Sequence, residues 1–285
     1  MATRYQKIKP AKPLAPYVHE IWVQENCNNA APEGHRPTRV LPVPRIDILF
    51  HYRDPFVQIN NGHRELLPRC YIVGQKTKPI EVAATGDTGI IILCFHPWGA
   101  APFFKLPLDE LLNISLDLSL LLGTRMIATI EARILGARDT AERVHLIQEF
   151  FIELLDTNKK DELVYESVFR INRSVGKSTV SRVADDLHIS RRQFIRRFKA
   201  AIGISPKSFS NIIRFQKAIF YLKSGVSWSE IAAQCGYYDQ SHFIKEFKGF
   251  SGRSPHQLFG DGSPTALMKS FNSADVSHFY NTIYL

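Results

Sequence analysis

A stretch near residue 195 carries basic side chains at a spacing suited to binding a polyanion. On a helical wheel drawn at about 100° per residue, Arg192, Arg196 and Lys199 fall within about 60° of one another. Phe194 and Phe198 fall on the opposite side, where they would anchor the helix to a core. Guanidinium and ammonium groups bind phosphates, and arginine also pairs with the major-groove edge of guanine. The pattern therefore predicts a helix that enters the major groove of DNA.

A second stretch, near residue 245, repeats this geometry. Its outward side chains are Ser241, Lys245 and Lys248, and its inward side chains are Phe243, Phe247 and Phe250. An isoleucine flanks each outward stripe, Ile195 in the first stretch and Ile244 in the second. The alternative interpretation of both stripes is the solvated face of a helical bundle, or a helical module that binds another protein.

The two stretches belong to an internal repeat. Four residues of the first copy recur 49 positions later, namely Phe194, Phe198, Gly203 and Pro206 as Phe243, Phe247, Gly252 and Pro255. Upstream, segments 181–184 and 229–232 match at an offset of 48. The second copy therefore has one extra residue in the turn between its two helices.

Each copy is expected to fold as a helix, a tight turn and a second helix. The residues that mark the helix ends are Ser190 with Gln193, Ser227 with Glu230, Gly236 and Asp239. Between the copies, residues 206–223 make one continuous helical pattern, about 27 Å long. A rod of that length would hold two recognition helices about one DNA turn apart, roughly 34 Å.

The positive charge of the chain is confined to the same region. The net charge is +9, and residues 160–260 hold 17 Lys and Arg against 8 Asp and Glu. Residues 1–159 are nearly balanced, with 18 against 17. A basic surface in one segment favours a polyanionic partner. The alternative is a lysine-rich domain without such a partner.

The first hundred residues have a different character. Short runs rich in β-branched and aromatic residues are separated by Pro and Gly, and they predict strands at 18–23, 45–52, 56–60, 71–74, 80–84 and 89–95. Asn61-Gly62 is typical of a hairpin turn. From Leu108 to about Asp156 the periodicity becomes helical.

The predicted fold class is α+β. Residues 1–160 are expected to form a β-rich, small barrel-like domain with helices after it, and residues 161–260 an all-α domain of two helix-turn-helix units joined by a long helix. Residues 261–285 make a tail to which the sequence assigns no role.

A helical stripe of Val144, Ile147, Phe151 and Leu154 has two interpretations. It could form a short antiparallel dimer seam, or it could pack on its own domain. The pattern alone does not decide between them.

Composition limits the class of protein. No apolar run reaches the roughly 18–20 residues that cross a bilayer, and the N-terminus has no apolar core of the secretory type. Four scattered cysteines, with no CxxC, indicate reduced thiols in a cytoplasmic protein: Cys27, Cys70, Cys94 and Cys235. Cys235 is interpreted as a small core residue. No cofactor is expected.

Several N-terminal residues have a functional and a structural interpretation. The histidines His35, His51, His63 and His96 lack the compact spacing of a metal site, so no metal is expected. Arg45 and Asp47 would point to one face of a strand, either into a pocket or as a surface ion pair, which is the favoured interpretation. His96 and Trp98 could line a ligand cavity or belong to a core.

The helical repeat resembles the DNA-binding domain of the AraC/XylS family. The matching stretches are SRVADDLHISRRQFIRRFKAAIGISP and SEIAAQCGYYDQSHFIKEFKGFSGRSP, within residues 165–260. The second, with its Ala-x-x-Cys-Gly-Tyr-Tyr-Asp-Gln-Ser-His-Phe run, is close to the signature of the family. The resemblance implies a transcription regulator whose two recognition helices enter successive major-groove segments.

Site residues follow from this resemblance position by position. The base-reading candidates are Arg192, Ile195 and Arg196 in the first helix and Gln240, Ser241 and Lys245 in the second. Ile195 replaces the polar residue often found at such a position, and it would suit a thymine methyl group. The phosphate-contact candidates are Thr179, Arg191, Lys199, Ser229, Lys248 and Arg253.

The N-terminal part is similar, more weakly, to the β-rich sensor-like domains of such regulators. The matching stretches are LAPYVHEIWVQE, LPVPRIDILF, YIVGQKTKPIEV and ILCFHPWGAAPFF. This resemblance implies an effector-binding or dimerisation domain, with Arg45, Asp47, His96 and Trp98 as pocket candidates. The implied partners are double-stranded DNA, with RNA polymerase, a small-molecule effector and a second copy of the chain as further candidates, and no membrane.

Two enzymatic functions are alternatives to a transcription regulator. A DNA-repair enzyme with the same DNA-binding module would need a nucleophilic cysteine among paired cysteines, and no such spacing is present. An N-terminal barrel enzyme would need a nucleophile–base or metal motif, which the sequence does not display. Neither is favoured, so the chain is not expected to be an enzyme.

Overall fold

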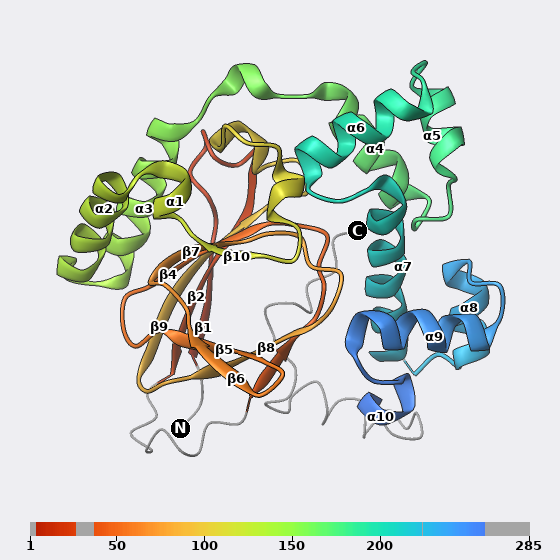
Figure 1. The fold of residues 1–285 in the computed structure, drawn as a ribbon, viewed down its shortest axis with the longest axis horizontal. Coiled ribbons are helices and arrows are strands. Elements are labelled where there is room, and N and C mark those ends of the chain that lie inside the picture. Colours follow the sequence, from red (N-terminus) through yellow and green to blue (C-terminus); the bar gives the residue numbers. More distant parts are fainter. Residues whose placement is uncertain (1–3, 27–36, 224, 260–285) are drawn as a thin grey trace.

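The computed structural model describes residues 4–26, 37–223 and 225–259, which form a β-rich half and a helical half (Figure 1). The predicted tail at 261–285 lies outside the described residues, as do Cys27 and His35. No helix in the described part of the chain is long and apolar enough to cross a membrane.

The larger sheet has six antiparallel strands. Their order is β1 (Arg4–Ile8), β2 (Val18–Asn26), β9 (Thr88–Phe95), β4 (Asp47–His51), β7 (Cys70–Val73) and β10 (Ser115–Asp117). The central strands β4, β7 and β9 are buried along their whole length, because both faces of the sheet are covered. Continuous apolar runs such as Ile90–Phe95 are typical of strands in that position.

The smaller sheet has four strands in the order β3 (Thr38–Val40), β8 (Ile80–Ala84), β5 (Phe56–Asn60) and β6 (His63–Leu66). Strands β5 and β6 form the predicted hairpin, with Asn61 and Gly62 at φ 49° and 83°. Positive φ at both central residues is what the tight hairpin turn requires, and Asn-Gly tolerates it best.

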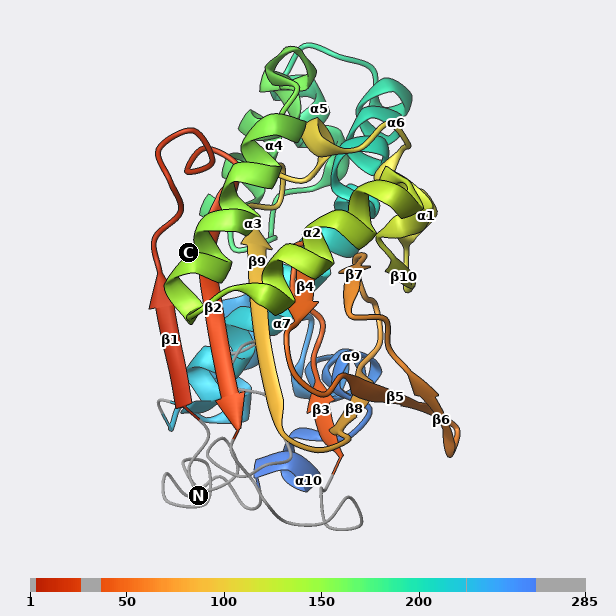
Figure 2. The same cartoon turned by 90° about the vertical axis from the view of Figure 1, so that its left-hand side faces the viewer.

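Helices cover one face of the larger sheet. They are α1 (Ser119–Leu122), α2 (Thr124–Gly136) and α3 (Thr140–Leu154), and Figure 2 shows α2 and α3 lying across the strands. Val144, Ile147 and Phe151 of α3 are buried in the core between helices and sheet, with Leu154 packed at its edge. The stripe therefore packs on its own domain, which decides between the two interpretations of the sequence.

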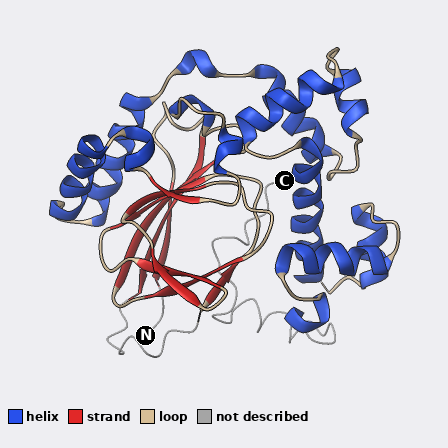
Figure 3. Ribbon diagram, in the orientation of Figure 1, coloured by secondary structure: helices blue, strands red, loops and turns tan. Residues whose placement is uncertain are grey.

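The other face of the larger sheet lies toward the smaller one. A second core fills this space, with Leu49, Tyr71 and Ile92 from the larger sheet and Phe56 and Val82 from the smaller. The β-rich domain with helices after it is confirmed, and its described strands form two sheets, not a closed barrel (Figure 3). The sequence patterns did not reveal β1, β3, β6 or β10.

Three 3-10 turns lie between the domains or near them, η2 (Ala101–Phe103), η3 (Leu108–Leu111) and η4 (Thr157–Lys159). The helical half then begins with α4 (Glu162–Arg173), whose N-cap is Asp161. The proposed boundary between residues 160 and 161 falls between η4 and α4, and it stays a prediction.

The helical half contains the two predicted units. The first has α5 (Val180–Asp186) and α6 (Arg191–Ile202), and the second has α8 (Trp228–Cys235) and α9 (Gln240–Ser251), followed by α10 (Pro255–Phe259). Helix α7 (Pro206–Lys223) runs from one unit to the other. Each unit has a separate hydrophobic core, and α7 contributes to both.

Candidate nucleic-acid interface

Helix α6 is anchored by aromatic residues on one side and exposes basic residues on the other. Phe194 and Phe198 are fully buried and contact each other edge to face, with ring centroids 5.6 Å apart. The residues Arg192 and Arg196 are exposed, and Ile195 beside them is half-buried. The helix begins at the N-cap Ser190, whose hydroxyl accepts a hydrogen bond from the Gln193 N–H at 3.2 Å. The predicted wheel geometry is present.

Helix α9 has the same construction. Phe243 and Phe247 are fully buried, and their ring centroids lie 5.7 Å apart. The carboxylate of the N-cap Asp239 accepts a hydrogen bond from the His242 N–H at 2.7 Å. The side chains exposed on the opposite side are Gln240, Ser241, Lys245 and Lys248.

The phosphate-contact candidates are grouped at helix ends. Thr179 caps α5, and its hydroxyl accepts from the Arg182 N–H. Ser227 and Glu230 complete the predicted capping box of α8, and the exposed Ser229 lies in its first turn. Arg191 and Arg253 are exposed. Free N–H groups at such helix starts favour an anion.

Helix α7 joins the two aromatic anchors. Phe209 of α7 packs against Phe198, with ring centroids 5.4 Å apart, and Phe215 packs against Phe247 at 5.2 Å. Because one unbroken helix of 18 residues fills both cores, the separation of the two units is fixed by its length.

The turns of the two units differ by one residue, as the repeat predicts. Both pass through a left-handed residue, His188 at φ 54° and Gly236 at φ 72°. In the first unit Ile189 follows and the N-cap Ser190 comes directly after it. In the second unit Tyr237 and Tyr238 separate Gly236 from the N-cap.

Backbone hydrogen bonds identify which tyrosine is the extra one. The Ile189 N–H donates to the Ala184 carbonyl at 3.1 Å, and the Tyr237 N–H donates to the Ala232 carbonyl at 2.9 Å. Tyr237 is therefore the counterpart of Ile189, and Tyr238 is the inserted residue.

One of the phosphate-contact candidates is engaged by the N-terminal domain. The ammonium of Lys199 lies 3.3 Å from the Asp109 carboxylate, which belongs to η3. Nearby, Arg197 makes two hydrogen bonds, of 3.0 and 2.7 Å, to Asp161. Sequence patterns did not predict either pair, since the partners lie far apart in the chain or outside the repeat.

The C-terminal ends of both recognition helices lie against the N-terminal domain. A Cβ at Gly203, the C-cap of α6, would be 3.1 Å from both the Gln75 Cγ and the Leu108 carbonyl oxygen. One at Gly252, the C-cap of α9, would be 3.3 Å from Pro79. Both glycines also have left-handed φ, of 93° and 75°, so two constraints favour glycine there.

The segment between β3 and β4 completes the domain contact. Leu41 is buried in the core of the second unit, beside residues of α7 and α8. The side-chain amide of Gln216, on α7, donates to the Pro42 carbonyl at 2.6 Å. The N-terminal domain therefore contacts both units and the helix between them.

The four pocket candidates lie at or beside adjacent ends of the neighbouring strands β4 and β9. Arg45 and Asp47 form an ion pair, with the guanidinium Nε 2.7 Å from the carboxylate, and their side chains are 1% and 2% exposed. The favoured interpretation as a surface pair was wrong, because residues 43–50 pass through the interior. The pKa of Asp47 is raised, because the effect of burial exceeds the opposite effect of the positive charge of Arg45.

His96 and Trp98 directly follow β9, where the Phe95 N–H donates to the Ile46 carbonyl at 3.2 Å and the His96 ring meets His19 at 5.1 Å. The rings of His96 and Trp98 are stacked at 4.8 Å with an interplanar angle of 1°, and the Trp98 ring meets Tyr165 edge-on. The indole N–H donates to the Pro16 carbonyl at 3.1 Å. The four candidates thus form two side-chain pairs, Arg45 with Asp47 and His96 with Trp98, on neighbouring strand ends.

The remaining thiols and imidazoles are dispersed. Cys70, Cys94 and Cys235 are free and buried, and burial raises the pKa of Cys235 to about 11. Cys235 lies in the core of the second unit, where a small residue was predicted. His51 is buried and His63 is exposed on β6, and the described residues contain no cluster of three or more potential metal ligands.

Two family models match parts of the chain. Residues 183–260 match a family described as a helix-turn-helix domain, and residues 6–117 match a family described as a domain of unknown function (DUF6597). The two matches leave α1 to α4 uncovered.

Known transcription regulators are similar over about a third of the chain. The HTH-type transcriptional regulator MtrA of Neisseria gonorrhoeae is 34% identical over 93 residues, which are 32% of this chain and 31% of that protein. The HTH-type transcriptional activator RhaS of Escherichia coli O1:K1 is 34% identical over 77 residues, 27% of this chain and 28% of that protein. The chain thus spans about a third of the length of these relatives.

A solved structure is similar over most of the chain at low identity. The structure of ToxT from Vibrio cholerae has a TM-score of 0.43 and 11% identity, with 90% of this chain and 96% of that one covered.

Proposed function

We propose that the protein is a sequence-specific DNA-binding transcription regulator of the AraC type, on the premise that residues 183–260 match a helix-turn-helix domain. Helices α6 and α9 enter successive segments of the major groove on one face of the duplex. The N-terminal domain serves a sensing or dimerisation role.

One observation carries the proposal. Two helices of 12 residues each are anchored by a buried phenylalanine pair, present polar and basic side chains on the opposite side, and are held by the same helix. A merely solvated bundle has no reason to repeat this arrangement, including the left-handed turn residue and the N-cap. The excess of positive charge in the same segment supports the same partner.

The base-reading roles follow from side-chain chemistry. Arg192 and Arg196 suit guanine, Gln240 suits adenine, and Ser241 and Lys245 donate hydrogen bonds to base acceptors. Ile195 suits a thymine methyl group. Contacts to the phosphates of the DNA position the protein without reading sequence. They come from the helix starts at Thr179 and Ser229 and from the side chains of Arg191, Lys199, Lys248 and Arg253.

The test is selection of bound duplexes from a random DNA pool by the full-length protein, read by sequencing. We expect two short enriched blocks about one helical turn apart. Enrichment of a single block would contradict the use of both helices. Folded protein that enriches nothing, and whose binding disappears at moderate salt, would contradict sequence reading altogether.

Binding of a small polar effector by the N-terminal domain is the second part of the proposal. The side chains of Asp47, His51 and Thr88 are 2%, 2% and 0% exposed, on strands β4 and β9 of the larger sheet. Neither nitrogen of His51 nor the hydroxyl of Thr88 has a hydrogen-bond partner in the described residues. Buried polar groups of this kind are normally paired, so they favour a polar ligand.

This role can be tested with a panel of small polar metabolites and thermal unfolding. An effector should raise the melting temperature of the wild type, and His51→Phe should lose that response while keeping a cooperative transition. A response that is equal in both proteins would contradict a site at His51. RNA polymerase, a second copy of the chain and a cytoplasmic location stay predictions that follow from the regulatory role.

A further inference from the structure

Tyr238 has the most exposed side chain among the large apolar and aromatic residues of the described chain. It is 93% exposed, whereas its neighbour Tyr237 is 6% exposed and packs in the core of the second unit. Single exposed aromatic residues are common on protein surfaces, so exposure alone indicates nothing. The position of Tyr238 in the fold is what indicates a role for its side chain.

Tyr238 lies at the entrance of the second recognition helix. It immediately precedes the N-cap Asp239, and it is the residue by which this turn exceeds the turn of the first unit. Helix-turn-helix proteins place the N-terminal end of the recognition helix against the bases. A side chain that projects from the preceding turn is therefore next to the DNA backbone that borders the groove.

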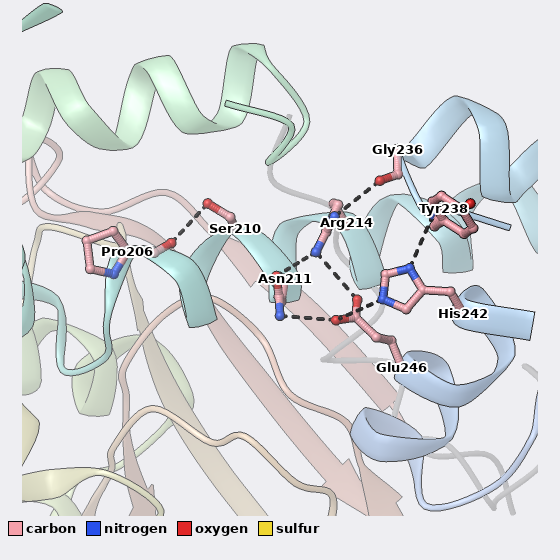
Figure 4. Close-up of polar contacts among 8 residues, drawn as sticks. All are labelled: Pro206, Ser210, Asn211, Arg214, Gly236, Tyr238, His242 and Glu246. Carbon is pink, nitrogen blue, oxygen red and sulfur yellow. Dashed lines mark hydrogen bonds and ion pairs between the residues drawn. The ribbon is translucent and has the colours of Figure 1, made fainter. Parts of the chain in front are cut away.

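The backbone of Tyr238 is held by the recognition helix itself. Its N–H donates to the Nδ1 atom of His242 at 3.2 Å, as Figure 4 shows. Since Nδ1 accepts this bond, the proton of the neutral ring lies on Nε2, which is 3.7 Å from a Glu246 carboxylate oxygen. His242 therefore connects the inserted residue to the middle of α9.

The other side of the turn is held by α7. Arg214 donates to the Gly236 carbonyl at 3.3 Å, to the Asn211 amide oxygen at 2.6 Å and to Glu246 at 3.5 Å. Asn211 in turn donates to Glu246 at 3.3 Å. The turn is thus fixed on both sides by side chains (Figure 4), and only the tyrosine ring remains to be ordered on binding.

We propose that the Tyr238 hydroxyl donates a hydrogen bond to a phosphate oxygen of the DNA strand beside the groove segment that α9 enters. The proposal rests on the proposed function and adds a contact that the repeat does not predict. A phenol is a neutral donor to phosphate, so it fixes the register of α9 on the duplex without reading a base. The first unit has no counterpart, because its turn lacks the residue.

The substitution Tyr238→Phe removes the donor and keeps the ring. It should weaken binding about tenfold, which corresponds to about 1.4 kcal/mol, on the selected duplex and on a random duplex alike. The dependence of affinity on salt should not change, because no charge is removed. The control Tyr5→Phe removes an equivalent hydroxyl from β1, in the N-terminal domain, and should bind as the wild type does.

Chemically modified duplexes test the phosphate directly. Single methylphosphonates, which are uncharged, are placed one at a time along both strands beside the second selected block. The wild type should lose affinity at each contacted phosphate, and at one of these positions Tyr238→Phe should lose nothing further. If both proteins respond equally at every position, the hydroxyl does not contact a phosphate.

Other outcomes separate this contact from the function itself. If Tyr238→Phe binds normally while Tyr238→Ala binds weakly, the ring packs on a sugar or base and the phosphate contact is wrong. If Tyr238→Phe binds normally while Arg196→Ala loses sequence preference, the proposed regulatory function is supported and the proposed Tyr238 contact is wrong. If the folded wild type selects no duplex at all, both proposals fail together.

Discussion

The ammonium of Lys199 on α6 lies 3.3 Å from the carboxylate of Asp109, which belongs to the N-terminal domain. The pair joins the recognition helix of the first unit to η3, next to the place where Gly203 meets Leu108. A lysine held by a carboxylate is less available to a phosphate. The same side chain therefore serves domain contact in this structure and DNA contact in the proposed complex.

Removing the acidic partner should strengthen DNA binding. Both side chains are partly exposed, so the pair contributes no more than about 1 kcal/mol, and Asp109→Asn should tighten binding by up to about fivefold. The slope of log affinity against log salt should stay close to that of the wild type, because Lys199 reaches a phosphate in both complexes.

The matched control for this prediction is Asp87→Asn. Asp87 is also partly exposed and pairs with Arg53 of its own domain, so the variant has the same change in net charge. Equal tightening by both variants would mean that net charge, and not the release of Lys199, is responsible.

Arg196→Ala should relax sequence preference. If the guanidinium pairs with a guanine, the selected duplex loses about 1–3 kcal/mol of binding free energy, and the preference at that base disappears. Repeating the duplex selection with the variant measures this directly. Arg133→Ala, which removes an arginine from the outer side of α2, should leave the selected sequence as it is.

Lys199→Ala should act differently from Arg196→Ala. A phosphate contact is independent of sequence, so selected and random duplexes should weaken together and the salt slope should fall by about one unit. A change in the preferred sequence would instead make Lys199 a base-reading residue.

Phe151 tests the assignment of the α3 stripe to the domain core. Its side chain is fully buried, and Phe151→Ala should lower the free energy of unfolding by about 3–5 kcal/mol. The adjacent Ile152 is 36% exposed, so Ile152→Ala should cost much less. Chemical denaturation measures both. A dimer that dissociates in Phe151→Ala while the protomer keeps its stability would restore the dimer seam.

His51 should make the stability of the protein depend on pH. Burial lowers its pKa to about 3, and the positive charge of Arg69 adds to this, whereas the unfolded value is about 6.5. Between those values the unfolded chain binds more protons, so acid favours unfolding. The stabilising contribution is complete above about pH 6.5 and is lost progressively as the pH falls toward 3.

Denaturation at pH 7, 6 and 5 measures the effect. His51→Phe should reduce the pH dependence by up to about 1.4 kcal/mol per pH unit below about pH 6. His63→Gln, which changes an exposed imidazole, should not. An unchanged slope in His51→Phe would mean that this ring is hydrated or paired in solution.

The helical half could be predicted closely because its signals are local. The caps Ser190, Ser227 and Asp239 and the glycines after the helices act within one turn of the chain, so the sequence marks them directly. The inserted turn residue was likewise visible from the change in repeat offset. Its identity as Tyr238 needed the backbone hydrogen bonds of both turns.

The contacts between distant segments could not be predicted in this way. The Lys199–Asp109 pair and the burial of Leu41 in the second unit depend on how the domains pack, and no local pattern encodes that. Arg45 and Asp47 looked like surface residues because their charge argues for exposure, and only the fold shows that they neutralise each other inside. The edge strands β1 and β6 lack the apolar runs that reveal central strands.

Because α7 is continuous, its number of residues determines the distance and the rotation between α6 and α9, and so the spacing of the two operator blocks. Each residue added to a helix advances it by about 1.5 Å and turns it by about 100°. One insertion in α7 would therefore point α9 away from the duplex face used by α6, whereas a whole number of turns would keep the phase and lengthen the spacing. In proteins derived from this one, the spacing between the two operator blocks should therefore change in discrete steps, each a whole number of turns of α7.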